Sequence, residues 1–180
     1  CGGRTDSTAD SARGPDNARQ FWTALTALCG QAYGGRVIES VPADTAMSAA
    51  RLVMHVRDCG ADTIRIPFHV GENRSRTWVL TRTATGIRLK HDHRHEDGVP
   101  DSVTMYGGDT QGEGTGERQE FFADSLTASL IPAARANVWT LELHPQRSFV
   151  YALRREGSDR RFRAEFDLAT PVPAPPPAWG

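Results

Sequence analysis

Three histidines stand at alternate positions within one short stretch of this chain, and an imidazole can ligate a metal, carry a proton or form hydrogen bonds. They are His91, His93 and His95. Alternate residues of a β-strand point to the same face of its sheet, and Ile87 and Leu89 stand just upstream with the same parity. A regular strand over residues 87–95 would therefore turn all three imidazoles toward an apolar interior.

A metal site is one function that this spacing supports. Neighbouring imidazoles on one strand stand ~6.6 Å apart, so two of them can converge on Zn²⁺ if an adjacent strand supplies a third ligand. Candidates for that ligand are His55, His69, Asp109 and Glu120. Two alternatives need no metal. Inward histidines can form hydrogen bonds with one another, with a tyrosine such as Tyr106 and with carboxylates. The strand can also end at Lys90 and leave the histidines in a solvated loop, because Asp97-Gly98 marks a turn.

A second candidate binding feature is a group of arginines around Trp78. Its members are Arg74, Arg76, Arg82 and Arg88. Guanidinium groups bind oxyanions through paired hydrogen bonds, so the group can recognise an anionic ligand. The alternative is a solvated sheet face on which the arginines pair with acidic residues. The candidate ligand-binding residues are Trp78, Arg88, Tyr106 and Asp109. No catalytic set stands out, since a Gly-x-Ser-x-Gly motif is lacking and Cys59 is expected in a disulfide, so the sequence leaves catalysis open and favours binding over it.

The elements that must position these residues are short strands. Alternating apolar and polar residues predict about ten of them, joined mostly by tight turns. Those near the histidines are 64–70, 77–83, 87–95 and 102–106, the last followed by a glycine-rich loop over 107–116. A helix is expected from Asp16 or Asn17 to Cys29, and a short second helix from Asp124 or Ser125. The pattern predicts an all-β fold, an antiparallel up-and-down β-barrel similar in layout to the calycin (lipocalin-type) barrels.

The chain has 180 residues, which suits one domain with a core of its own. We expect a flexible tether over 1–16, a helix-plus-barrel domain over 17–169 and a proline-rich tail over 170–180. The formal net charge of −1 provides no strong field for a polyanion, so no nucleic-acid partner is predicted. No apolar run approaches the roughly 20 residues of a transmembrane helix.

The three cysteines predict a compartment and a covalent link. Cys1, followed by Gly2 and a polar stretch, is typical of a mature bacterial lipoprotein, so we expect lipidation at Cys1 and an anchor in the outer membrane. Cys29 and Cys59 then remain as a pair, which an oxidising periplasm would join in a disulfide. In the cytosol they would instead be two buried free thiols.

Several stretches resemble an uncharacterised family of bacterial secreted proteins and lipoproteins. The likeness covers most of residues 20–169 and is carried by residues 74–78, 88–98 (with Lys-His-Asp-His-Arg-His-Glu-Asp-Gly), 106–110 and 137–142. The resemblance implies a place in the cell envelope and no assigned activity. We therefore expect a lipid-anchored, periplasm-facing protein that binds a small ligand or an envelope protein without catalysis. The alternatives are a metal-binding protein or metal-dependent enzyme that uses the three histidines, and an inhibitor of an envelope-directed enzyme.

Overall fold

The structure, a computed structural model, describes residues 16–180. Within them, eleven antiparallel strands form one sheet. The strands are β1 (Ala32–Val41), β2 (Leu52–His55), β3 (Asp58–Cys59), β4 (Thr63–Val70), β5 (Asn73–Thr83), β6 (Gly86–His93), β7 (Tyr106–Thr110), β8 (Arg118–Ala123), β9 (Asn137–His144), β10 (Ser148–Arg155) and β11 (Arg161–Val172). The helices are α1 (Asp16–Thr26), α2 (Thr45–Ala49), α3 (Ser125–Leu130) and the 3-10 helix η1 (Pro132–Ala134). The lipidation predicted at Cys1, with nearly all of the predicted tether, lies outside the described residues.

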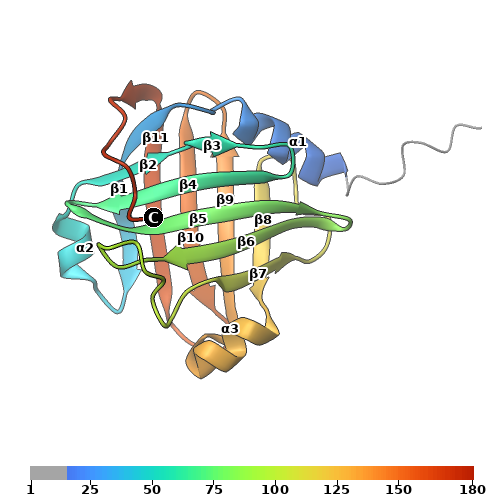
Figure 1. Cartoon of the computed structure of the whole chain (residues 1–180). Coiled ribbons are helices and arrows are strands. Elements are labelled where there is room, and N and C mark those ends of the chain that lie inside the picture. The colour runs from blue at the N-terminus through green and yellow to red at the C-terminus, as the bar shows by residue number, and fades with distance from the viewer. Residues whose placement is uncertain (1–15) are drawn as a thin grey trace, which may run out of the picture.

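The sheet closes on itself as an up-and-down barrel. From β4 to β11 each strand pairs with the next, β11 pairs with β1, β1 with β2, and β2 with β4. The short β3 adds to β4 beside β2. Strands β4 to β7 cross β9 to β11 at a steep angle, which gives the barrel two layers with the core between them (Figure 1). The predicted all-β barrel with an N-terminal helix is therefore confirmed.

Helix α1 closes one end of the barrel. Its apolar residues recur at helical spacing, and Phe21, Trp22 and Leu25 are buried in the core. Beyond the helix, Gly30 adopts a positive φ of 82° and turns the chain into β1. The predicted disulfide is confirmed, since Cys29 is bonded to Cys59 with 6.3 Å between their Cα atoms. The bond ties the end of α1 to β3.

Large apolar side chains fill the barrel next to α1. They come from the inward positions of six strands and include Leu80, Leu89, Phe121, Leu141, Phe149 and Phe166. All six are almost completely inaccessible to solvent. The barrel therefore has no open channel leading from the α1 end to the opposite end.

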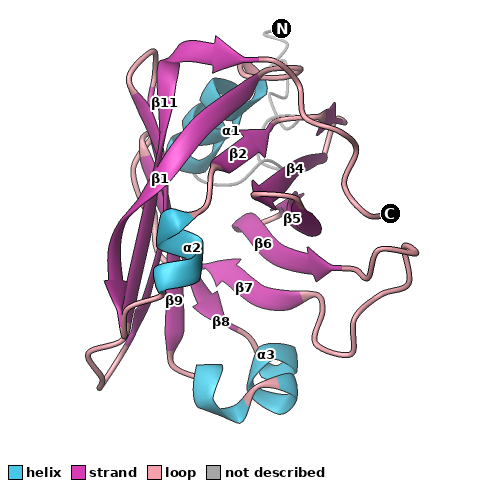
Figure 2. Ribbon diagram, turned by 90° about the vertical axis from the view of Figure 1, so that its left-hand side faces the viewer, coloured by secondary structure: helices cyan, strands magenta, loops and turns pink. Residues whose placement is uncertain are grey.

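The opposite end, called here the mouth, is bordered by connections rather than by a long helix. They are the segment with α2 (42–51), the β4–β5 turn (71–72), the β6–β7 loop (94–105), the segment with α3 (124–136) and the β10–β11 turn (156–160). Figure 2 shows α1 and α3 at opposite ends of the barrel. Helix α3 begins after Asp124, whose carboxylate accepts hydrogen bonds from the backbone and hydroxyl of Thr127, as the sequence predicts for a cap. Helix α2 was not predicted.

The β6–β7 region differs from the prediction. Strand β6 ends at His93, two residues early, and residues 102–105 are part of the loop rather than a strand. Strand β7 starts at Tyr106 and includes Gly107 and Gly108, which were expected in a loop. The glycines are needed because β7 passes very close to its neighbours: a Cβ on Gly107 would collide with the Leu89 carbonyl oxygen, and one on Gly108 with that of Phe122.

The C-terminal residues pack on the barrel. Strand β11 continues to Val172, three residues into the predicted tail, and the remaining residues cross the outer surface of β2 and β4 to reach β5 (Figure 1). There the Trp179 backbone N–H donates to the Arg74 carbonyl oxygen at 3.1 Å, and the Arg74 guanidinium donates to the Pro177 carbonyl oxygen at 3.0 Å. Across residues 16–180, no helix combines the length and apolar character needed to cross a bilayer.

Candidate ligand-binding site at the barrel mouth

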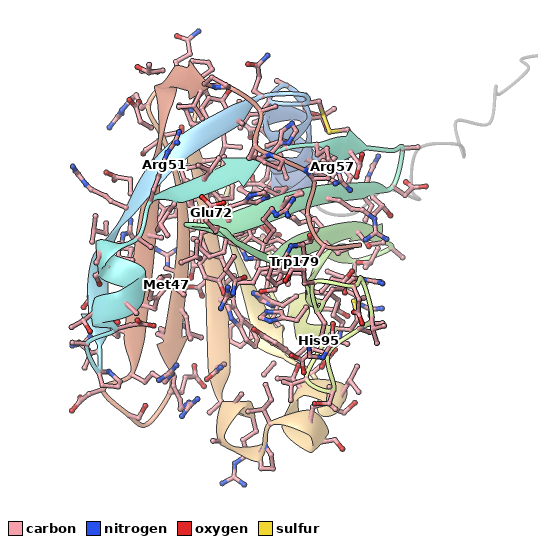
Figure 3. The ribbon with its side chains drawn as sticks, turned by 60° about the vertical axis from the view of Figure 1, so that its left-hand side comes forward. Met47, Arg51, Arg57, Glu72, His95 and Trp179 are labelled. Atoms are coloured by element: carbon pink, nitrogen blue, oxygen red, sulfur yellow. A yellow bond between two sulfur atoms is a disulfide. The ribbon has the colours of Figure 1, made fainter. Side chains whose placement is uncertain are left out.

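A cavity of about 480 Å³ opens at the mouth, a size that suits a small organic ligand. Residues 40–47, which lead into α2, form one wall, and inward residues of β4 to β7, β10 and β11 form the floor and the other walls. The side chains that give the cavity its chemistry are Arg76, Trp78, His91, His93, Tyr106 and Tyr151. Figure 3 shows Met47, another lining residue, on α2.

His91 is held on both of its ring nitrogens. Its side chain lies at the inner end of the cavity, and the residue is 3% exposed. Nδ1 is 3.1 Å from the Tyr106 carbonyl oxygen, which can only accept, so Nδ1 carries the proton and donates. Burial lowers the pKa of His91 to about 3, so its Nε2 is an unprotonated acceptor at neutral pH. Nε2 therefore accepts from the Tyr151 hydroxyl at 2.9 Å.

Tyr151 completes this buried network. Its hydroxyl donates to Nε2 of His91 at 2.9 Å, and its ring stacks on Trp78. Burial raises the pKa of Tyr151 well above the usual value of a phenol. With both ring nitrogens of His91 and the hydroxyl hydrogen of Tyr151 used inside the protein, this pair serves to fix the floor of the cavity.

His93 and Tyr106 form the second pair, and they are closer to solvent. The Tyr106 hydroxyl lies 3.1 Å from Nε2 of His93. Burial, and after it the charge of Arg76, lowers the pKa of His93, while burial raises the pKa of Tyr106 to about 12. Both groups are therefore neutral near pH 7. If the Tyr106 hydroxyl donates to Nε2 of His93, the Nδ1–H of His93 remains free for a ligand. If Nε2–H of His93 donates instead, the hydroxyl hydrogen of Tyr106 remains free.

Stacked rings form the apolar part of the floor. The Trp78 ring stacks on Phe68 at 4.8 Å and on Tyr151 at 4.6 Å between centroids. Trp78 is 2% exposed, so it supports the floor more than it meets solvent. Phe162 and Leu153 are partly buried and extend the apolar wall along β11 and β10. Interlocked rings of this kind give a rigid surface against which an apolar ligand can pack.

Positive charge predominates in the lining. Among the described residues, three arginines (Arg76, Arg160 and Arg161) and one carboxylate (Asp44) line the cavity. Arg161 is paired with Glu39 at 3.0 Å, and Asp44 accepts the Met47 backbone N–H at 2.9 Å. Arg76 belongs to the predicted arginine group. The other three members, Arg74, Arg82 and Arg88, do not line the cavity.

The histidine predictions are confirmed for two residues and wrong for the third. His91 and His93 follow the inward parity of Leu89 and form hydrogen bonds. His95 is exposed in the β6–β7 loop (Figure 3), because β6 ends before it and parity no longer applies. The three imidazoles do not converge. In the part of the chain that the structure describes, no group of three or more His, Cys, Asp or Glu side chains is placed to hold a metal ion.

The other proposed metal ligands lie apart from the cavity. Glu120 binds Arg118 and Arg154 on the barrel surface. His55 and His69 are not among the lining residues, and burial lowers the pKa of both imidazoles. His69 is buried, and its Nε2 has no hydrogen-bond partner among residues 16–180.

Of the four predicted ligand-binding residues, the structure brings Trp78 and Tyr106 to the cavity and leaves Arg88 and Asp109 outside it. Arg88 Nε binds Asp109 Oδ1 at 2.6 Å between β6 and β7, with both side chains nearly half exposed. The reason is parity, since Arg88 alternates with Ile87 and Leu89 and must face outward.

Sequence reasoning missed Tyr151, Phe68 and Phe162 as site residues. Each stands at an inward position of its strand. For Phe68 and Phe162 the signal was present in the sequence, since Ile66 and Phe68 alternate with Arg65 and Pro67, and Phe162 and Ala164 with Arg161 and Arg163. For Tyr151 it was not, because Phe149, Val150 and Tyr151 are consecutive and all buried. Which inward residues meet across the barrel depends on closure and stagger, and alternation does not contain that information.

The chain matches no family of known proteins, and neither the curated proteins nor the solved structures include a significant match to it.

Proposed function

We propose that this protein binds a small organic ligand in the mouth cavity and does so without catalysis. The observation that carries this proposal is the cavity itself: about 480 Å³, closed below by the ring stack around Trp78 and open at the mouth. Apolar walls with a few oriented polar groups are the usual composition of small-molecule sites.

The hydrogen-bond network favours binding over catalysis. His91, the most deeply buried imidazole of the site, is bonded on both nitrogens, so it has no free nitrogen with which to take a proton from a substrate. His93 has a phenol partner rather than a serine or cysteine nucleophile. The groups that remain free can orient a ligand through donated hydrogen bonds.

The disulfide supports a location outside the cytosol. Bonds such as Cys29–Cys59 persist in oxidising compartments, of which the bacterial periplasm is one. We therefore extend the proposal to a ligand met in the cell envelope.

Binding can be tested with N-phenyl-1-naphthylamine, a neutral fluorescent probe that brightens in apolar surroundings. We expect saturable binding of one probe per chain. A Leu153→Trp variant should bind the probe at least tenfold more weakly, because the larger ring would occupy the cavity beside Phe162.

The matched control is Ile38→Trp, which adds a ring of the same size at an exposed position of β1 outside the cavity lining. It should bind the probe as the unmodified protein does. Failure of the unmodified protein to bind in a saturable way would overturn the proposal. So would equal losses in the two variants, since the probe would then report general loosening of the fold.

A further inference from the structure

We infer that the ligand of the mouth cavity is a compact aromatic carboxylate whose charge is bound by Arg76. This inference rests on the proposed function and adds the chemical class of the ligand. It starts from the position of Arg76 on the inner face of β5, where its backbone pairs with Phe68 on β4 and His93 on β6.

The guanidinium of Arg76 has donors to spare. Nη1 donates to Asn73 Oδ1 at 3.1 Å and makes a longer contact of 3.4 Å with Ser75 Oγ, and both partners are neutral. No carboxylate of residues 16–180 lies within 4.0 Å of it as an ion-pair partner, although most cationic side chains around the barrel have one. A guanidinium offers five N–H donors in a fork that fits a carboxylate, so most of this fork remains for a ligand.

The groups around Arg76 leave its charge uncompensated. The charge of Arg76 lowers the pKa of three titratable side chains that line the cavity, His93, Tyr106 and Tyr151. All three are neutral near pH 7, because the imidazole is deprotonated and the phenols are protonated. Asp44, the one carboxylate that lines the described part of the cavity, is occupied as the cap of α2. A partly desolvated cation without a counterion is stabilised by an anionic ligand.

The remaining donors and walls define the rest of the ligand. The paired His93 and Tyr106 side chains keep one hydrogen for an acceptor, and the same carboxylate can use it. The body of the ligand would face Phe162, Leu153 and the edge of the ring stack, which favour an aromatic group. A long chain is excluded by the filled barrel below, where Phe149 and Phe166 are completely buried.

The test is displacement of N-phenyl-1-naphthylamine by 2-naphthoate and by 2-naphthamide, which have nearly the same shape and differ in charge. We expect 2-naphthoate to displace the probe at a concentration at least tenfold lower than 2-naphthamide. In Arg76→Gln the two competitors should become equal within about twofold, with each displacement concentration corrected for the affinity of that variant for the probe. Arg76→Lys should keep part of the preference, because it retains the charge and loses the paired geometry.

The matched control is Arg82→Gln on the same strand. Arg82 also lacks a carboxylate partner among the described residues, but it lies at the α1 end, with its guanidinium 5.9 Å from the Trp22 ring centre. This variant should keep the full preference for 2-naphthoate. An equal loss in Arg82→Gln would assign the effect to overall charge and overturn the inference. Equal displacement by both competitors in the unmodified protein would overturn it too, while leaving the binding function intact; absence of probe binding would overturn the binding function itself.

Discussion

Nε2 of His91 accepts a hydrogen bond from the Tyr151 hydroxyl at 2.9 Å, and this bond connects β6 with β10, two strands that are not neighbours in the sheet. It closes the barrel interior at the level of the cavity floor. The Trp78 ring stacks on the same tyrosine, so the polar network and the ring stack support each other. The site is therefore built on rigid strands, and its geometry depends on the stability of the barrel.

Removing the Tyr151 hydroxyl should destabilise the protein through the lost hydrogen bond, because the aromatic ring stays in place and no large cavity forms. In Tyr151→Phe the buried Nε2 of His91 loses its hydrogen-bond partner, and we expect a loss of about 1–3 kcal/mol in the free energy of unfolding. Urea denaturation monitored by circular dichroism measures it. Tyr33→Phe is the matched control, because the Tyr33 hydroxyl makes no hydrogen bond to another described residue, and its stability should be nearly unchanged. Equal stabilities of the two variants would contradict the role given to this bond.

Burial of neutral His91 should make the protein sensitive to acid. Above pH 6.5 the imidazole is neutral in both the folded and unfolded chains. Below that pH the unfolded chain binds a proton that the folded chain excludes until about pH 3, so stability falls as the pH falls. The contribution of His91 is about 2 kcal/mol between pH 6.5 and pH 5.

This contribution is isolated by comparing the unmodified protein with His91→Gln, which has a donor and an acceptor but does not titrate. The free energy of unfolding should decline less steeply with acid in the variant. His55, His69 and His93 also have a lowered pKa, and they contribute equally to both proteins. Parallel curves for the two proteins between pH 6.5 and 5 would show that His91 is not held neutral.

Strand parity explains how much of the site was visible in the sequence. Ile87, Leu89, His91 and His93 share one face because a strand without a bulge must alternate, and the structure agrees residue by residue. The same rule placed Arg88 outside, so its assignment as a ligand residue conflicted with the alternation already apparent in the sequence. The end of β6 was harder to predict, because it depends on the pairing of the backbone with β7 and on the loop between them.

Contacts across the barrel could not be predicted from the sequence. Tyr151 stands 60 residues from His91, and nothing in the alternation of β10 indicates that it meets β6. Strand β7 was missed because Gly107 and Gly108 are typical of loops, whereas here they allow close approach to β6 and β8. The Cys29–Cys59 pair could be predicted from the number of cysteines, because only these two remain once Cys1 is assigned to lipidation. That prediction needs no knowledge of strand register.

Loss of the disulfide should lower stability without changing the cavity. The bond closes a loop with a sequence separation of 30, for which chain entropy gives about 3–4 kcal/mol. Cys29→Ala/Cys59→Ala should lose this amount and still bind N-phenyl-1-naphthylamine, because the bond lies at the α1 end. Dithiothreitol should destabilise the unmodified protein and leave the variant unaffected. A variant as stable as the oxidised protein, or one whose stability still depends on dithiothreitol, would contradict this assignment.

The close approach of β7 and β8 predicts a strong effect of a single methyl group. A Cβ at Gly108 would overlap the backbone of Phe122 and come within 3.2 Å of the Asp124 N atom, and backbone in a closed barrel cannot move aside as a flexible side chain can. We expect Gly108→Ala to lose about 3 kcal/mol in the free energy of unfolding, measured by urea denaturation.

The matched control is Gly34→Ala on β1, where the nearest atom to the added methyl would be Val172 Cγ1 at an ordinary 3.7 Å. This variant should be unchanged or up to about 1 kcal/mol more stable, because alanine restricts the unfolded chain. If Gly108→Ala were as stable as Gly34→Ala, β7 would not pass as close to β8 as the structure places it, and the position of Tyr106 at the start of β7 would need revision.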